Sequence, residues 1–450
     1  KFAPGGARKP LSAGPGRLLT GRRRSCMVWA ASFRVAGAAA AGMVCRRMPA
    51  GAPSLSPCPC EQRMRVPSPS KTSPAAGSLR VVPVQSRADR AAFLRLPRSL
   101  YQDDPHWVEP LHLEQRQWFA ADNPFYEHAE ARFWLALRDG RPVGRISAQV
   151  DRLHLERHRD SAGFFGLLEA VGQDETVRAL LETAKDWLRE RGMAHVRGPF
   201  NLSVNQECGL LVDGFDRPPM LMMGHARPYY AARLEACGYH KERDLLAYLI
   251  DSDVEATPVR RMAVARTRRR ITTRTVSRKN FQEDLDLIFT LFNDAWADNW
   301  GFVPMTRSEI THMAGGMKFL INERFARIAM VDGEPAAFIV VLANLNAAIT
   351  GLHGRLFPFG WRRLLWRLKG RHPRSGRMLL MGVRKAYQES LLGAALAYRL
   401  IGDIQPDVVA SGMREVELSW VLEDNQGVRS IIGEFGGRAY KRYRIYGRAL

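Results

Sequence analysis

The alternation of apolar and polar residues becomes regular from residue 79 onward. The segment 79–85 (LRVVPVQ) has the period of two that is typical of a β-strand, and the apolar spacing over 86–100 predicts a helix. After a loop, the segment 131–151 contains two apolar runs joined by Asp139-Gly140, a dipeptide that predicts a tight β-hairpin. This region therefore begins as strand, helix and hairpin.

The same series of elements returns later in the chain. A strand, a helix and a hairpin are predicted over 274–342, and the hairpin turn again contains Asp-Gly. The offset between the turn residues Asp139 and Asp332 is 332 minus 139, or 193, and the offset between the loop residues Trp107 and Trp300 is 300 minus 107, again 193. This agreement indicates an internal duplication.

The two halves also end alike, because 227–251 and 428–450 each read as helix, glycine and strand. The fold class that follows is α/β with mixed sheets, in two tandem domains. We place these domains at 79–255 and 270–450 and interpret the charged segment 251–270 as a linker between them.

The first 78 residues differ in composition from the rest of the chain. They are built of Ala, Gly, Pro, Ser and Arg without a sustained period, so we expect residues 1–78 to form a disordered tail, a targeting segment or an over-extended upstream translation. Four of the six cysteines lie there, which leaves Cys208 and Cys237. This usage favours a reducing compartment, and we expect a cytoplasmic protein.

The net charge of +22 is concentrated in the same tail. Residues 1–78 contain 13 Lys and Arg against the single acid Glu61, a balance of +12, which leaves +22 minus +12, or +10, for the remaining chain. Basic residues elsewhere are dispersed among acids, so we expect no nucleic-acid partner. His154 and His158 are four residues apart without a third ligand nearby, and we predict a solvated pair and no metal site.

A strand and helix near the C-terminus carry the motif that suggests a family. The segment 377–401 (RMLLMGVRKAYQESLLGAALAYRLI) is followed by a strand over 415–425 (EVELSWVLEDN) and by a closing helix and strand. In this order of elements the chain resembles bacterial tandem-domain members of the GCN5-related N-acetyltransferase (GNAT) superfamily. That family has a Gln/Arg-x-x-Gly-x-Gly/Ala loop whose backbone N–H groups hold the coenzyme A pyrophosphate at a helix N-terminus.

The resemblance implies a set of residues that bind acetyl-CoA or another acyl-CoA. Leu391 stands where the motif has its first glycine. The implied coenzyme-binding residues are Gly382, Val383, Arg384, Lys385, Gln388, Gly393, Ala394 and Asn425.

The strand 415–425 supplies the candidate catalytic residues. Because side chains alternate along a strand, Glu415, Glu417 and Ser419 share one face. Glu417 is the first candidate for the general base, with Glu415 second, and the alternative is that this face is merely solvated. The tyrosine acid that the family often has in its closing helix is missing; Tyr387, Tyr440 or water are candidates to replace it. Trp300 and Ser419 are expected to lie in the pocket that binds the acceptor substrate.

The first half lacks features of a coenzyme site. The helix that corresponds to the pyrophosphate-binding helix begins with Asp174 and Glu175, whose charge repels an anionic ligand. We therefore expect 79–255 to be non-catalytic. Polar residues alternate over 201–207, which predicts either a polar cleft or a partly solvated strand, and Cys208 is expected to be a buried apolar residue.

An insertion in the second half, 351–377, is rich in arginine and apolar residues and has no acid. Two roles are open for this insertion: a peripheral contact with the inner membrane face, or a lid packed on the protein.

The resemblance implies an N-acyltransferase that transfers an acetyl or other acyl group from acyl-CoA to a small-molecule amine. The alternatives are a lipid-amine N-acyltransferase that uses long-chain acyl-CoA and a non-catalytic GNAT-like binding protein.

Overall fold

The computed structural model describes residues 78–450 apart from residue 268 and the ranges 318–321 and 370–372. The predicted tail over 1–78 lies, except for Ser78, outside the described residues. The remaining chain forms a mixed α/β structure, which confirms the predicted fold class.

The first half contains seven strands. They are β1 (Leu79–Pro83), β2 (Ala129–Arg138), β3 (Arg141–Asp151), β4 (Ala162–Ala170), β5 (His195–Gly198), β6 (Leu210–Asp213) and β7 (His240–Asp251). Its helices are α1 (Arg87–Leu100), α2 (His112–Gln115), α3 (Arg152–His158), α4 (Asp174–Arg189) and α5 (Tyr229–Ala236), with 3-10 turns at Arg116–Phe119 and Pro124–Glu127.

The second half contains β8 (Ile271–Thr275), β9 (Ala326–Val331), β10 (Glu334–Ala343), β11 (Ser375–Val383), β12 (Glu415–Leu422) and β13 (Arg438–Ala449). Its helices are α7 (Phe281–Ala295), α8 (Arg307–Met317), α9 (Leu345–Ile349), α10 (Gly360–Lys369), α11 (Lys385–Gln388), α12 (Leu391–Ala410) and α13 (Gln426–Glu434), with a 3-10 turn at Glu323–Phe325.

Both predicted hairpins are present, and their turns have the same backbone conformation. Asp139 and Gly140 have φ of 51° and 76°, and Asp332 and Gly333 have φ of 51° and 92°. These positive values at both central residues match the twist of the flanking strands, and Asp-Gly adopts them at little cost. Hairpins β2–β3 and β9–β10 follow from this turn chemistry.

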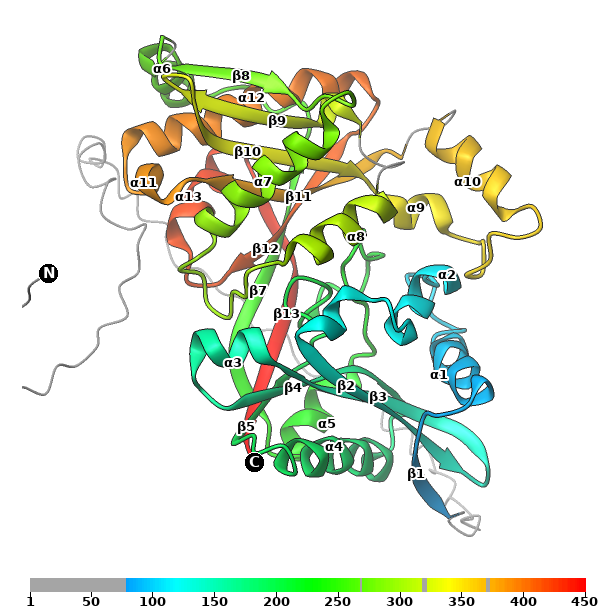
Figure 1. Cartoon of the computed structure of the whole chain (residues 1–450). Helices are drawn as coiled ribbons and strands as arrows, with labels where there is room; N and C mark the ends of the chain where they lie inside the picture. Colours follow the sequence, from blue (N-terminus) through cyan, green and yellow to red (C-terminus); the bar gives the residue numbers. More distant parts are fainter. Residues whose placement is uncertain (1–77, 268, 318–321, 370–372) are drawn as a thin grey trace, which may run out of the picture.

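The strands of both halves join in one sheet because the halves exchange their last strands. The order is β1-β2-β3-β4-β5-β13-β7-β12-β11-β10-β9-β8, with β6 beside β13. Strand β13, which ends the second half, pairs with β5 of the first, and β7, which ends the first half, pairs with β12 of the second. The two long strands run side by side through the centre of the molecule (Figure 1) and join the two ends of the sheet.

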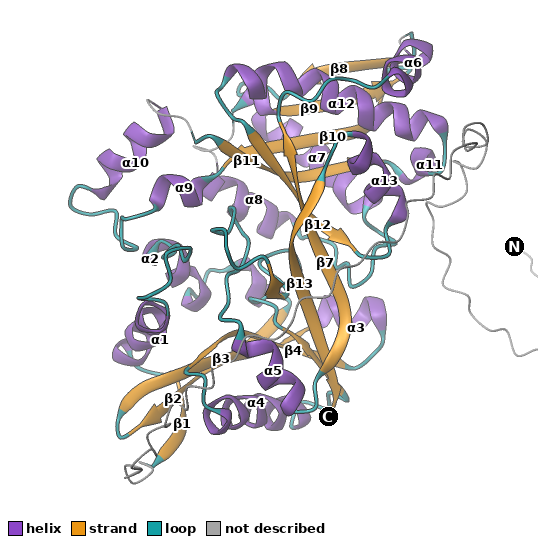
Figure 2. Ribbon diagram, turned by 180° about the vertical axis from the view of Figure 1, so that it is seen from behind, coloured by secondary structure: helices purple, strands orange, loops and turns teal. Residues whose placement is uncertain are grey.

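Helices cover the outer parts of this sheet, and Figure 2 shows α4 and α5 at one end and α12 at the other. In the second half α12 and α7 contribute to separate apolar clusters. Leu396 and Leu400 of α12 lie in one cluster, and Phe289 and Phe292 of α7 lie in the other. The sheet therefore buries both faces there, which explains the almost continuous apolar run of β10.

The segment 251–270, interpreted as a linker, proves to be largely helical. It forms α6 (Pro258–Thr267), which packs on α12. The guanidinium of Arg260 is buried, lies 3.5 Å from the centre of the Phe435 ring and donates a hydrogen bond to the Glu255 carbonyl. The basic composition concealed this role, because the aliphatic stem and flat head of an arginine can cover an apolar surface. Whether 79–255 and 270–450 fold separately stays a prediction.

Candidate active site

Strands β11 and β12 run parallel and then separate. Their pairing extends from Ser375 and Glu415 to Met378 and Leu418, after which β11 continues to Val383 and β12 to Leu422. The gap between the two strand ends opens into a cavity of about 1090 Å³. A thioester arm that enters this gap can pair with backbone groups of either strand.

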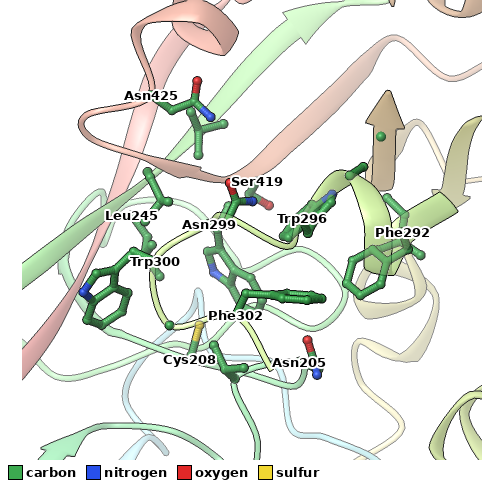
Figure 3. A pocket seen from close by; sticks show the side chains of 18 of the residues that line it. Asn205, Cys208, Leu245, Phe292, Trp296, Asn299, Trp300, Phe302, Ser419 and Asn425 are labelled. Carbon is green, nitrogen blue, oxygen red and sulfur yellow. The ribbon is translucent and has the colours of Figure 1, made fainter. Parts of the chain in front are cut away.

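The cavity lies between the two halves and is lined by both. Apolar side chains make up much of its lining, among them Phe164, Phe200, Leu202, Leu245, Phe292, Trp296, Trp300, Phe302, Val303, Met378, Leu379 and Leu418. Figure 3 shows Ser419 and Asn425 on the β12 side of the cavity and Cys208 and Asn205 of the first half across from them. A long apolar chain can therefore be enclosed with a polar group held near Ser419.

Ser419 belongs to a buried polar group, of which both Ser419 and Arg377 line the cavity. Its hydroxyl donates to Glu417 Oε1 at 2.6 Å and accepts a hydrogen bond from Arg377 Nε at 2.9 Å. Arg377 Nε also lies 3.6 Å from Glu417 Oε1, and Tyr440 donates its hydroxyl to Glu417 Oε2. The carboxylate of Glu417, which is fully buried, thus has hydrogen-bond or ionic partners at both oxygens.

Burial changes the acidity of the groups around Glu417. Burial and the charge of Glu417 raise the pKa of Tyr440 well above its usual range. Burial lowers the pKa of Arg377, and the charge of Glu417 opposes this change. Glu417 itself is not among the residues that line the cavity, and Ser419 connects it to the cavity through their hydrogen bond.

The other two candidate catalytic residues lie outside the cavity lining. Glu415 forms an ion pair with Arg217 at 2.9 Å, at the edge of β12. Tyr387 lies in the short helix α11, where its carbonyl accepts a hydrogen bond from the Ser390 hydroxyl. The structure thus places Glu417 and Ser419 together and keeps Glu415 and Tyr387 apart from them.

Three of the predicted coenzyme-binding residues line the cavity at the end of β11: Gly382, Val383 and Gln388. The Gln388 amide donates to the carbonyls of Ala295 and Val383 at 2.7 and 2.8 Å. These bonds fasten the loop after β11 to the end of α7. Gln388 therefore acts on the shape of the loop, and its side-chain donors are already used.

The loop residues predicted to hold pyrophosphate have internal partners. The backbone N–H of Lys385 donates to the Asp294 carboxylate at 2.8 Å, and the Lys385 ammonium pairs with Asp298 at 2.5 Å. Gly393 is needed for packing, since a Cβ at this position lies only 2.2 Å from the Tyr387 carbonyl oxygen. Ala394 is buried in α12, Arg384 is exposed, and Leu391, at the position of the missing glycine, is 72% exposed.

Asn425 links the cavity to the closing helix. Its side-chain oxygen accepts a hydrogen bond from the Val428 N–H at 3.1 Å and so caps α13, and the residue lines the cavity. The splayed strands and this residue fit the pantetheine arm of an acyl-CoA. The loop at Lys385 fits a pyrophosphate less well, because two carboxylates already occupy its donors.

Trp300 lies at the first-half side of the cavity between two cations. The Arg197 and Arg243 guanidinium carbons are 6.0 and 5.8 Å from the centre of its ring.

The prediction of a solvated histidine pair is wrong for His154, which is buried, stacks on His158 and contacts Asp160 at 3.1 Å. Both histidines line the cavity.

Cys208 lies at the far wall of the cavity and is 6% exposed, as expected for an apolar residue. Burial raises the pKa of its thiol.

Arg377 was not among the residues predicted from the sequence, because only its contacts across the sheet reveal its place in the site. It donates to the Leu221 carbonyl of the first half at 2.7 Å as well as to Ser419.

The corresponding gap of the first half is filled by the chain itself. Phe200 donates its N–H to the Phe165 carbonyl at 2.8 Å, and a Cβ on Gly166 lies 1.8 Å from the Phe200 oxygen. Asp174 and Glu175 at the start of α4 pair with Arg233 and Arg138. Of the two alternatives for 201–207, the partly solvated strand is wrong, because this segment is an irregular loop, and its residues Ser203 and Asn205 line the cavity.

The described part of the chain has neither a cluster of metal-ligating side chains nor a helix long and apolar enough to cross a bilayer. Among these residues no group of three or more His, Cys, Asp or Glu side chains is arranged to hold a metal ion. None of the helices described here combines the length and the apolar character that crossing a bilayer requires.

Comparison with known proteins reveals related chains. The sequence is 41% identical to Protein YghO of Escherichia coli (strain K12) over 362 residues, or 80% of this chain and 93% of that protein. It is also 41% identical to the bacterial ceramide synthase of Caulobacter vibrioides (strain NA1000 / CB15N) over 378 residues, or 83% and 98% of the two chains. No family model matches.

Among solved structures, a tandem GNAT protein from the clavulanic acid biosynthesis pathway matches with a TM-score of 0.48 and 14% identity, over 83% of this chain and 98% of that one. The sheet of this chain is mixed and contains a parallel pair, β11 and β12, that separates. At 41% identity over most of both lengths, the chain belongs to the family that includes Protein YghO and the bacterial ceramide synthase.

Proposed function

We propose that this protein transfers an acyl group from an acyl thioester to the primary amine of a long-chain amino lipid. The observation that carries the proposal is the cavity of about 1090 Å³, which is lined mainly by apolar side chains and includes Ser419, just beyond the last paired residues of β11 and β12. A relative named bacterial ceramide synthase supports an amine acceptor of this class.

The donor arm enters between β11 and β12. Acyl-CoA would supply the activated thioester, and Gly382, Val383 and Asn425 would contact its pantetheine. Backbone N–H groups at the end of β11 would polarise the thioester carbonyl as its oxygen gains negative charge. The apolar wall formed by residues such as Met378 and Leu379 excludes water, which suppresses hydrolysis of the thioester.

Ser419 and Glu417 would move the proton. The amine nitrogen attacks the thioester carbon, and as the C–N bond forms, the nitrogen gives one proton to Ser419 Oγ while Ser419 gives its own proton to Glu417. The C–S bond then breaks, and the thiolate takes the proton from Glu417 through Ser419, so that the products are an amide and a thiol and the Glu417 carboxylate is restored. Arg377 would hold Ser419 in place through its Nε.

Residues of both halves would form the acceptor side. Trp300, Phe302 and Leu202 provide an apolar surface for a hydrocarbon chain. Polar atoms nearby, such as the side chain of Asn205, suit the hydroxyl groups of an amino alcohol. In this scheme the first half contributes Leu202 and Asn205 to the acceptor site and has no donor site of its own.

An assay of the full chain tests the proposal. Acetyl-CoA and palmitoyl-CoA are offered with sphinganine, a long-chain amino diol, or with 2-amino-1,3-propanediol, which has the same polar head without the chain. Mass spectrometry of the amide is expected to show product only with sphinganine. Amide formation from the short amine at an equal rate would refute the lipid acceptor, and no amide with either amine, together with no binding of either thioester, would favour a non-catalytic binding protein.

Variants in the buried group test the mechanism. Ser419→Ala and Glu417→Gln are expected to lower kcat by roughly 100-fold or more and to leave donor affinity within about threefold. Glu415→Gln distinguishes the two candidate acids. Because Glu415 contacts Arg217 outside the cavity, this substitution should lower kcat far less than Glu417→Gln does. An equal loss in Glu415→Gln and Glu417→Gln would contradict the assigned roles.

A further inference from the structure

The segment that leads into and forms α10 has the largest collection of exposed apolar side chains in the described part of the chain. Phe357 is 76% exposed and Phe359 is 67% exposed, and three residues of α10 follow: Trp361 (44%), Leu365 (44%) and Trp366 (60%). In Figures 1 and 2 this helix lies at the periphery, away from the central strands. Exposed apolar residues gathered in this way mark a contact surface.

The helix has two different sides. Leu364 and Leu368 pack against the apolar cluster beneath it, and Arg367 donates to the carbonyls of Ala348 and Thr350 at 2.8 and 2.6 Å. These contacts fasten α10 to α9 and leave its outer side free. The outer side is therefore presented in a fixed orientation, which lowers the entropy cost of binding.

The outer side combines apolar and cationic residues. Arg362 and Arg363 are exposed between Trp361 and Trp366, and the whole insertion 351–377 contains no acid. Tryptophan favours the interface between lipid headgroups and acyl chains, and arginines near it attract anionic headgroups. Each cation near an anionic surface adds to the attraction, which salt screens.

We infer that Phe357, Phe359 and the outer side of α10 dock the protein on the surface of an anionic lipid bilayer. The alternation of arginine with exposed tryptophan favours a bilayer over nucleic acid or an acidic protein, since a purely ionic partner needs no exposed aliphatic and aromatic surface. The inference does not depend on the acceptor, because binding to vesicles is measured without substrate.

Vesicle flotation of the full chain tests the inference. The wild type is expected to float with vesicles of phosphatidylcholine and phosphatidylglycerol. With vesicles of phosphatidylcholine alone it is expected to stay at the bottom of the gradient. Trp361→Ser/Trp366→Ser and Arg362→Glu/Arg363→Glu are each expected to weaken binding by roughly tenfold or more. The matched controls Met262→Ser on α6, where the side chain is 49% exposed, and Arg178→Glu on α4 should bind as the wild type does.

Two results would overturn the docking surface. One is equal flotation of all variants, which would place any lipid contact elsewhere. The other is binding that depends on the arginines alone and is abolished equally by heparin, which would indicate a general polyanion surface. Because the altered side chains are exposed, circular dichroism should show unchanged folding, and quenching of Trp361 and Trp366 by brominated lipid provides a readout that needs no variant.

Discussion

Arg377 and Glu417 form an ion pair that is buried in the middle of the sheet, with Arg377 Nε 3.6 Å from Glu417 Oε1 and exposed fractions of 1% and 0%. The pair joins neighbouring strands β11 and β12 at the last part of their pairing, where Arg377 lies opposite Glu417. Ser419 contacts both members. The same side chains that orient the cavity hydroxyl therefore also fix the point at which the strands separate.

Arg377→Met is expected to destabilise the protein, because it leaves the Glu417 carboxylate buried without its cation. Removing one partner of a buried pair typically costs about 3 to 5 kcal/mol of unfolding free energy. Urea denaturation checks this through the midpoint at constant slope. Arg270→Met, which removes the exposed pair with Asp332, serves as the control and should hardly change the midpoint. Equal midpoints for both variants would contradict the prediction.

The contact of His128 with Asp151 and Glu309 should make the protein less stable at alkaline pH. Burial of the His128 ring lowers its pKa, but Asp151 at 2.9 Å and Glu309 at 3.2 Å outweigh this and raise the pKa to about 9. The folded pKa exceeds the unfolded value of about 6.5, so the stabilisation is complete below pH 6.5 and is lost as the pH rises through 9.

Thermal melting between pH 6 and 10 tests this contact, which joins the first half to α8. The wild type is expected to lose more melting temperature between pH 7 and 10 than His128→Gln does. The difference between the two curves isolates His128 from other titrating groups. Parallel curves would show that His128 does not bridge the two carboxylates in solution.

Two glycines of α12 should respond to alanine in opposite directions. A Cβ at Gly393 meets the Tyr387 carbonyl oxygen at 2.2 Å, so Gly393→Ala must displace α11 and should lower both stability and donor binding. Gly402 is in the same helix with nothing within 4 Å of its Cβ position, and Gly402→Ala should stabilise by about 0.5 to 1 kcal/mol. Melting curves and calorimetric titration with palmitoyl-CoA distinguish the two, and a destabilised Gly402→Ala would refute the packing argument.

The carboxylates near Lys385 should oppose a donor that carries phosphate. Asp298→Asn removes the partner of the Lys385 ammonium, and the freed cation is expected to tighten binding of acyl-CoA by roughly two- to fivefold. Titration with palmitoyl-CoA and with the corresponding pantetheine thioester, which lacks the nucleotide, measures this. Tightening for both ligands, or for neither, would show that the phosphates bind elsewhere.

Local features of the fold were predictable from the sequence, and long-range pairings were not. The two Asp-Gly turns, the helix over 86–100 and the repeat spacing follow from backbone preference and apolar period, which act over a few residues. The exchange of β7 and β13 could not be predicted from the sequence, because an apolar period of two residues identifies a strand without identifying the strand beside it.

The candidate site divides in the same way. Glu417 and Ser419 were found together because they are two residues apart on one strand, whereas Arg377 is 40 residues from Glu417 (417 minus 377) and lacks a local motif. The segment 201–207 alternates in polarity and yet is a loop, since Asn201 uses its side chain to accept from Leu167 N–H at 2.8 Å and to donate to Glu207. Asn and Ser compete with strand pairing in this manner.

The position of β13 between β5 and β7 has a consequence for synthesis of the chain. Tyr443, Ile445 and Tyr446, which lie in this strand, are buried in the apolar cluster of the first half. A ribosome makes them after the whole first half, so the first half cannot close its core while it is the only part that has emerged. We therefore expect the nascent first half to depend on chaperones until β13 has emerged, in contrast to the usual order in which an N-terminal domain folds first.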